Sequence, residues 1–315
     1  MPRLDSRAIP LDYGPFATAP LLGNLSGVAF WDGLLWTVSD EGRTVECLMP
    51  AGAGYVLHRQ IVLDDLIAGL PGRGTSDEID LESIDISDGV LWLCGSHSMV
   101  RAKPRQPGQL NEKIHERPSR SVLMAGALDG GSIRAAGLRH APFSGKGSLR
   151  AELFKNAYLA PFAALPSKEG GLDIEGLTVW QGEVYLGLRG PKLSSVALVA
   201  RLGLAPKLRI DSVELNFLDL DGLGLRDLIR HDDGLLVLAG PTSEAPGPFR
   251  LYVWHPLPGP VIQKPELVFA WPETPEKPEG ICPDPAVSGA LIVLYDSPKD
   301  RIAGSVYWAD RLHLP

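Results

Sequence analysis

Short apolar segments recur along the chain, each opened by a glycine-containing turn and ended by small or polar residues. Such a run, apolar on both faces, indicates a strand that is covered on both sides. Too few residues separate each run from the apolar strand before it for a crossover helix, so the pairs are predicted to be hairpins in antiparallel sheets. The five runs are GLLWTVSD (33–40), GVLWLCGS (89–96), GEVYLGLR (182–189), GLLVLAGP (234–241) and GALIVLYD (289–296).

The strands that precede these runs share a second pattern. Aligned on their apolar residues they read LSGV (25–28), LESI (81–84), IEGL (174–177), LRDL (225–228) and PEGI (278–281). The second position is polar in every case, and the third is small in all but one. Small residues there make room where strands crowd together. The second-position residues are Ser26, Glu82, Glu175, Arg226 and Glu279.

This repeat predicts an all-β protein, a single β-propeller domain over residues 1–315. The second-position residues are 56, 93, 51 and 53 residues apart, and a four-stranded blade commonly takes about 40–50 residues. Five blades are therefore preferred. The long interval is expected to hold insertions after the second blade, at about 101–120 and 140–171, with a sixth, degenerate blade as the alternative. The N-terminal segment is expected to supply the last outer strand and close the ring, which removes exposed strand edges.

The repeat also locates a candidate site. In a propeller, the starts of the first strands and the ends of the second strands meet at the mouth of the central channel. Several carboxylates in one mouth repel each other and need cations. Two arginines from different blades, Arg189 and Arg226, could be these cations, because a guanidinium group can bind a carboxylate in bidentate fashion. The second-strand ends and their neighbours that carry charge or an imidazole are Asp40, Glu41, His97, Arg189 and Asp296.

Three interpretations of this constellation remain open. A closed Glu–Arg network could join adjacent blades. A divalent cation such as calcium could be held by Glu82, Glu175 and Glu279, because calcium takes many oxygen ligands. A ligand or catalytic site could use both charges. In that case the catalytic residues would be Glu175, His97 and Glu82, and the ligand-binding residues would be Arg189, Arg226, Asp227, Asp40, Glu41 and Asp296.

Composition narrows the function classes. The net charge of −8 and the pI near 5.4 argue against a nucleic-acid protein, whose affinity rests on basic surface. No apolar run approaches the roughly 20 residues that span a bilayer, and the N-terminal residues lack the pattern of a signal peptide. We therefore expect a cytoplasmic protein. The three cysteines form no disulfide framework, and Cys94 and Cys282 are expected to be buried thiols.

Three runs resemble a bacterial β-propeller family of unknown function. They are LDIEGLTVWQGEVYLGLRGP (172–191), GLGLRDLIRHDDGLLVLAGPT (222–242) and LIVLYDSP (291–298). This resemblance implies a propeller and no established activity.

A more distant similarity is to the esterase-like phytases. It rests on Glu175-Gly176-Leu177, Glu279-Gly280-Ile281 and Val38-Ser39-Asp40-Glu41. It would imply hydrolysis of phosphate esters, with calcium as a candidate cofactor. The sequence departs from this pattern at two second positions, Ser26 and Arg226, where glutamate is expected.

These observations predict a propeller that binds a polar, anionic small molecule, a divalent metal, or both, at the channel mouth. The alternatives are a metal-assisted hydrolase of phosphate or carboxylic esters, and a scaffold for a protein partner.

Overall fold

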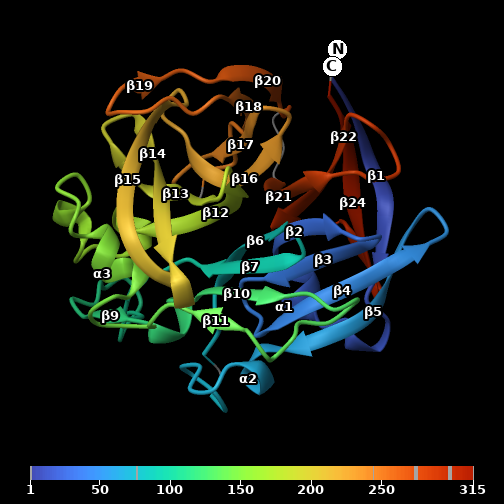
Figure 1. The fold of residues 1–315 in the computed structure, drawn as a ribbon, viewed down its shortest axis with the longest axis horizontal. Helices are drawn as coiled ribbons and strands as arrows, with labels where there is room; N and C mark the ends of the chain where they lie inside the picture. The colour runs from blue at the N-terminus through green and yellow to red at the C-terminus, as the bar shows by residue number, and fades with distance from the viewer. Residues whose placement is uncertain (1, 76, 244, 273–275, 297–299, 315) are drawn as a thin grey trace.

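The chain folds into antiparallel sheets that surround a common centre (Figure 1). The structure is a computed structural model that describes residues 2–75, 77–243, 245–272, 276–296 and 300–314. It is an all-β, propeller-like architecture, which confirms the predicted fold class. The final two residues of the LIVLYDSP run lie outside the described residues.

Most strands fall into groups of four that pair in sequence order. The first group is β2 (Leu25–Trp31), β3 (Leu34–Ser39), β4 (Thr44–Ala51) and β5 (Gly54–Val62). The second is β6 (Leu81–Ser87), β7 (Val90–Gly95), β10 (Leu123–Ala127) and β11 (Arg139–His140). The third is β12 (Asp173–Trp180), β13 (Glu183–Leu193), β14 (Val196–Ala205) and β15 (Arg209–Asp219), extended by β19 (Ile262–Gln263). The fourth is β16 (Gly224–His231), β17 (Gly234–Gly240), β18 (Arg250–Trp254) and β20 (Glu266–Ala270).

The last group draws on both ends of the described chain. It consists of β21 (Lys277–Pro283), β22 (Ala290–Asp296), β24 (Val306–His313) and β1 (Arg3–Asp12), with β23 (Ile302–Ala303) beside β24. β1 pairs antiparallel with β24, from Arg3 opposite His313 to Asp12 opposite Val306. It also pairs with two residues of β5, so the first and last groups form one continuous sheet.

The remaining elements are short and lie between the strands. β8 (Met99–Arg101) and β9 (Ile114–Glu116) form a separate hairpin. The helices are η1 (Gly14–Phe16), α1 (Ala19–Gly23), α2 (Leu63–Leu66), η2 (Pro118–Arg120), α3 (Leu149–Leu153), η3 (Ala160–Phe162), η4 (Ser167–Glu169) and η5 (Pro206–Leu208). Within the described part of the chain, no helix has the length and apolar character needed to cross a membrane.

Backbone conformation explains why the inner strands form tight hairpins. Asp32 and Gly33 both have positive φ, as do Asp88 and Gly89. Two consecutive residues with positive φ make the type I′ turn, whose twist matches that of the strands on either side. The turn glycines therefore precede the second strands by one residue.

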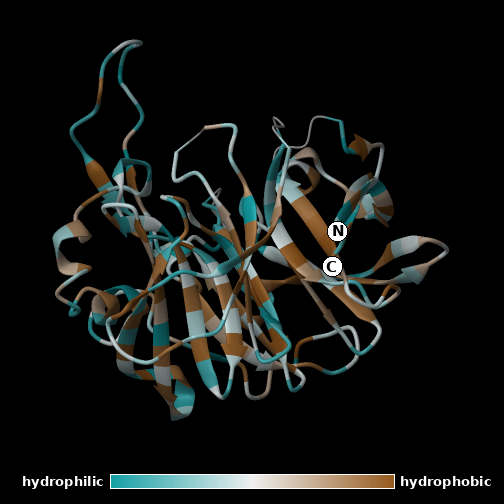
Figure 2. Ribbon diagram, turned by 90° about the horizontal axis from the view of Figure 1, so that it is seen from above, coloured by the Kyte–Doolittle hydropathy of each residue, from teal (hydrophilic) through white to brown (hydrophobic). Residues whose placement is uncertain are grey.

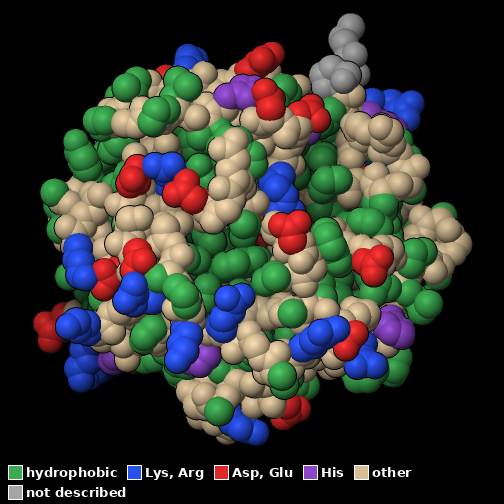
Figure 3. Space-filling model, in the orientation of Figure 1, with side chains coloured by type: hydrophobic (Ala, Val, Ile, Leu, Met, Phe, Trp, Pro, Cys, Tyr) green, Lys and Arg blue, Asp and Glu red, His purple; other side chains and the backbone are tan. Residues whose placement is uncertain are grey.

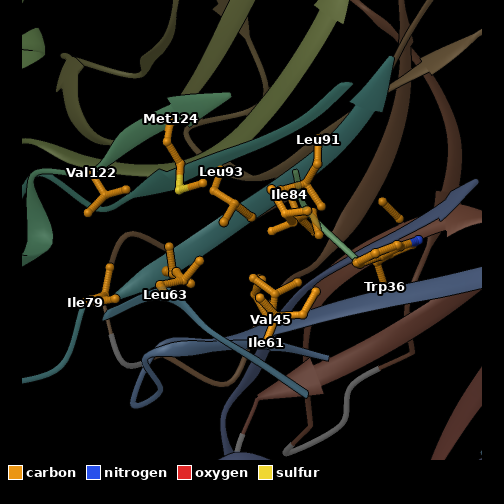
Figure 4. Close-up of a cluster of buried hydrophobic side chains, with 14 of the residues drawn as sticks. Trp36, Val45, Ile61, Leu63, Ile79, Ile84, Leu91, Leu93, Val122 and Met124 are labelled. Atoms are coloured by element: carbon orange, nitrogen blue, oxygen red, sulfur yellow. The ribbon is translucent and has the colours of Figure 1, made fainter. Parts of the chain in front are cut away.

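Apolar side chains fill the spaces between neighbouring sheets. One such cluster joins Trp36 and Val45 of the first sheet to Ile84 and Leu93 of the second (Figure 4). Similar clusters lie between the other neighbouring sheets, which explains why the second strands are apolar on both faces. Figure 2 shows the same division, with hydrophobic residues along the strands and hydrophilic residues in many of the loops. Cys94 and Cys282 are buried free thiols, as expected.

The first strand of each sheet lies at the centre. β2, β6, β12, β16 and β21 pack against one another in a closed ring. The ring is crowded at the third position of the repeat. A Cβ atom added to Gly176 would lie 3.0 Å from the Cβ and backbone nitrogen of Leu228 on the neighbouring strand. The small residues in this column are therefore required by the close approach of the strands.

Candidate functional site

Each of the five inner strands carries a β-bulge at the same point. In β6, Leu81 lies opposite Gly95 and Ser83 lies opposite Cys94, so the intervening Glu82 has no partner in the ladder. The corresponding register shifts leave out Ser26, Glu175, Arg226 and Glu279. A bulge redirects the side chain of its extra residue and is common beside active sites. The second-position residues found in the sequence are thus the five bulged residues of the ring.

These residues line a cavity of about 360 Å³, which we call the central cavity. Nine carboxyl-bearing residues and five cationic residues surround it, so acidic residues outnumber basic residues in its walls. The carboxylates are Asp40, Glu41, Glu78, Asp80, Glu82, Asp173, Glu175, Glu279 and Asp296. The cationic residues are Arg120, Lys168, Arg189, Arg226 and Lys277, and the remaining wall is Asn24, Leu25, Ser26 and Ser167.

A network of arginine and glutamate side chains crosses the cavity between the third, fourth and last sheets. Nη1 of Arg226 lies 2.6 Å from Oε1 of Glu279 and 3.3 Å from Oε2 of Glu175. Its Nη2 donates to the carbonyl oxygen of Pro241 at 2.8 Å. Arg189 binds the other oxygen of Glu175 through Nη1, and its Nε lies 3.7 Å from Asp173. Both arginines are therefore largely occupied by carboxylates of the ring.

Burial changes the acidity of the cavity carboxylates. It raises the pKa of Glu279 to about 8, although Arg226 acts in the opposite direction. It raises the pKa of Asp173 to about 7. Burial, with the charges of Asp80 and Asp296, raises the pKa of Asp40 to about 8. The pKa of Glu82 is raised well above its usual value by burial and by the carboxylates around it.

Glu82 differs from the other glutamates of the ring in its contacts. It forms no hydrogen bond or ion pair with any residue that the structure describes, and its side chain is partly accessible. Glu175 is 3% exposed, and its Oε2 receives no hydrogen bond within the described chain. Nη1 of Arg226, at 3.3 Å, is the ion-pair partner of this oxygen.

Eight of the residues expected at the channel mouth line this cavity. They are Asp40, Glu41, Glu82, Glu175, Arg189, Arg226, Glu279 and Asp296.

Asp227, expected to bind ligand, lies elsewhere. Its Oδ1 accepts from the backbone N–H of Leu228 at 2.7 Å, and its Oδ2 accepts from that of Ile281 at 2.8 Å. Asp227 thereby joins β16 to β21, and burial raises its pKa to about 8. The bulge at Arg226 explains the difference, because it turns the next side chain away from the cavity and toward the neighbouring strand.

His97, expected to act with Glu82 as an acid–base pair, also lies outside the central cavity. It lines a separate pocket of about 280 Å³, and its Nε2 contacts the carbonyl oxygen of Val122 at 3.1 Å. Its backbone has φ of 54°, a left-handed conformation that redirects the chain directly after β7. Burial lowers the pKa of His97 to about 4. The structure does not bring His97 and Glu82 together in one site.

Several residues that line the cavity were not predicted from the sequence. Asp80, Asp173 and Lys277 each lie two residues before a second-position glutamate. Side chains two residues apart point to the same side of a strand, so this alternation could have identified Asp173 and Lys277. Asp80 lies before β6 and has a positive φ of 56°, so alternation does not apply to it. Glu78 comes from a loop, and Arg120 and Lys168 come from the short helices η2 and η4, so their positions depend on the tertiary fold.

The glutamates expected to hold a metal are engaged in other contacts. Glu175 and Glu279 bind arginines, as described above. Within the described residues, no group of three or more His, Cys, Asp or Glu side chains is arranged to hold a metal ion. Glu175 and Glu279 thus belong to the carboxylate–arginine network, and Glu82 stands apart from it.

Comparison with solved structures supports the fold. The chain is 10% identical to a GH43 β-1,3-galactosidase, with a TM-score of 0.53, over 98% of this chain and 60% of that one. It is 11% identical to glutaminyl cyclase from Myxococcus xanthus, with a TM-score of 0.47, over 97% of this chain and 95% of that one. The PQQ-bound aldose sugar dehydrogenase from Streptomyces coelicolor is 12% identical, with a TM-score of 0.41 over 100% and 99% of the two chains. At 10% identity and a TM-score of 0.53, the likeness to the galactosidase shows the fold alone.

The sequence itself gives the family. No curated protein matches it. A family model described as a protein of unknown function, DUF3616, matches residues 24–306, which include all five inner strands. The chain therefore belongs to the DUF3616 family.

Proposed function

We propose that this protein is a five-bladed propeller that binds a polar small molecule in the central cavity. The blade number is supported by the five inner strands, each of which begins a group of four paired strands. The segments at 101–120 and 140–171 are then insertions. Among their described residues they contain the β8–β9 hairpin and short helices, and no further four-stranded sheet.

The charges of the cavity indicate what kind of molecule fits. An anion, expected from the sequence, would have to compete with Glu175 and Glu279 for the two arginines. A cationic group would not face this competition. It could contact the carboxyl groups directly, because they outnumber the cationic residues in the walls. A hydroxyl-rich molecule would also fit, since it can donate hydrogen bonds to carboxylate oxygens. We therefore favour a ligand with an ammonium or guanidinium group, or with several hydroxyl groups, over an anion.

The proposal rests mainly on the position and the contacts of Glu82. Its bulge directs it into the cavity, and no described residue binds its carboxylate. A carboxyl group with these surroundings is costly to bury unless a partner compensates it. A bound cation or hydrogen-bond donor would supply that partner and would favour the ionised form of Glu82.

Binding of n-hexylamine and of neutral monosaccharides, followed by ligand-observed NMR, tests the proposal. Glu82→Gln keeps the shape of the side chain and removes its charge, so it should weaken binding of the amine about tenfold or more. Glu116→Gln, on the exposed hairpin strand β9, is the matched control and should bind as the unaltered protein does. Equal affinity in Glu82→Gln and the unaltered protein would refute the role of this cavity in binding.

Hydrolysis is a second candidate function, and the raised pKa of Glu82 favours it. A carboxyl group whose pKa is raised by burial is suited to act as a general acid toward a leaving group. Glu175, held between two guanidinium groups, would be the second carboxylate of the pair. A screen of aryl glycosides, aryl phosphates and aryl carboxylic esters between pH 5 and 8 tests this candidate. Turnover that persists in Glu82→Gln would exclude Glu82 as the acid.

A further inference from the structure

The central cavity adjoins a second cavity that the proposed function does not use. This hairpin cavity has a volume of about 580 Å³ and lies between the β8–β9 hairpin and η4. It is lined by Met99, Val100, Arg101, Ala102 and Lys103 on the hairpin side, and by Pro166, Ser167, Lys168 and Glu169 on the other. Glu78, Arg120, Ser167 and Lys168 line both cavities, so the two are adjacent.

The hairpin cavity has the opposite balance of charge. Five cationic residues line it, against three carboxylates: Arg101, Lys103, Arg117, Arg120 and Lys168, with Asp77, Glu78 and Glu169. Lys and Arg side chains are also frequent on the part of the surface where Figure 1 labels α3 and β9, as Figure 3 shows. A molecule that extends through both cavities therefore passes from acidic walls to basic walls.

Ion pairs hold most of these cationic groups in place. Arg101 binds both carboxylate oxygens of Glu169, at 2.5 and 2.7 Å, and so ties the hairpin to η4. Arg117 lies 3.1 Å from Asp77. Lys103 forms no ion pair with any residue in the described part of the chain, and its side chain is exposed. It is therefore available to an anionic group.

Arg120 forms the wall between the two cavities. Its Nη1 lies 2.9 Å from Oδ2 of Asp80 and donates to Oγ of Ser98 at 3.0 Å. Its Nη2 binds Glu78. Because three partners hold this guanidinium group, it has a fixed position between the central cavity and the hairpin cavity.

From this arrangement we infer that the ligand is dipolar. Its cationic or hydroxyl-bearing end occupies the central cavity beside Glu82, and an anionic group, a carboxylate or a phosphate, lies in the hairpin cavity beside Lys103. This inference rests on the proposed function, and it adds an anionic group at the other end of the proposed ligand.

The test compares probes that carry one charge or both. Straight-chain ω-amino acids with four, six, eight and twelve carbon atoms are measured beside the alkylamine and the carboxylic acid of the same length, at low salt, by ligand-observed NMR. At one chain length, the amino acid should bind about fivefold more tightly than the amine, since one exposed charge-assisted contact contributes about that much. Lys103→Ala should reduce this amino acid to the affinity of the amine. Lys113→Ala, on the same hairpin but outside both cavities, should change neither.

The outcomes separate the two proposals. If the amines bind and no amino acid binds more tightly, the dipolar ligand is refuted while the polar binding site stands. The same holds if Lys103→Ala and Lys113→Ala have equal effects, or if the carboxylic acids bind as tightly as the amino acids. If no probe binds the unaltered protein, both proposals fail. A second series with phosphate monoesters of amino alcohols distinguishes a phosphate from a carboxylate.

Discussion

Arg226 offers the most informative single substitution in the ring. Its side chain is 4% exposed and lies against two carboxylates from different sheets, those of Glu175 and Glu279. Arg226→Met keeps most of the volume and removes the guanidinium. The substitution leaves two buried carboxylates short of a cation and also removes the donor to the carbonyl of Pro241.

The expected cost follows from these contacts. Removing one partner of a buried ion pair typically costs about 3–5 kcal/mol in the free energy of unfolding. Arg201 supplies the control, because it pairs with Glu183 and Glu214 at the surface and its side chain is 27% exposed. Arg201→Met should cost no more than about 1 kcal/mol.

The cost in Arg226→Met should also depend on pH. The pKa of Glu279 is already raised to about 8, and loss of the arginine raises it further. A carboxyl group with a raised pKa in the folded state loses its contribution to stability as pH rises toward that value. The variant should therefore be destabilised more at pH 9 than at pH 5.

Urea unfolding of both variants at the two pH values, followed by tryptophan fluorescence, measures these differences. A cost below about 1 kcal/mol in Arg226→Met at both pH values would refute the view that the arginine joins the sheets. So would a cost that is the same at pH 5 and pH 9.

Two further predictions concern the packing of the inner strands. Gly176→Ala should lower the free energy of unfolding by about 1–3 kcal/mol, because the new methyl group would lie 3.0 Å from Leu228; Gly23→Ala, whose methyl group would have no neighbour within 4 Å, should be close to neutral in the same urea titration. Asp227→Asn should cost about 1–2 kcal/mol at pH 5, since the amide cannot accept from both backbone donors. The pKa of Asp227 is about 8 in the folded protein, so its contribution is greatest below about pH 4 and falls as pH rises to 8. The difference between Asp227→Asn and the unaltered protein should therefore be smaller at pH 9, and a larger difference there would contradict this assignment.

The position of the candidate site could be predicted from the sequence because it follows from the repeat. Glu82, Glu175 and Glu279 occupy one column, and a column in a cyclic repeat converges on the axis. Asp173 and Lys277 were not predicted, although the same alignment could have identified them, because side chains alternate along a strand.

Other features could not be found in this way. The side chain of Asp227 is turned aside by the bulge before it, and that of His97 by a left-handed residue, and neither distortion has a distinctive sequence signal. The hairpin cavity depends on contact between Arg101 and Glu169, which are far apart in the chain. Long-range contacts of this kind are set by the fold as a whole.

The pairing of β1 with β24 has a consequence for how the protein is made. Arg3 lies opposite His313, so β1 finds its main partner only after the ribosome has added all the residues up to β24. At about 5–20 residues per second, the wait is roughly 15–60 s. During that time strand edges that are paired in the native protein are open to other chains in the cell. Changes in β1 should therefore reduce the yield of soluble protein during synthesis before they measurably affect the finished molecule.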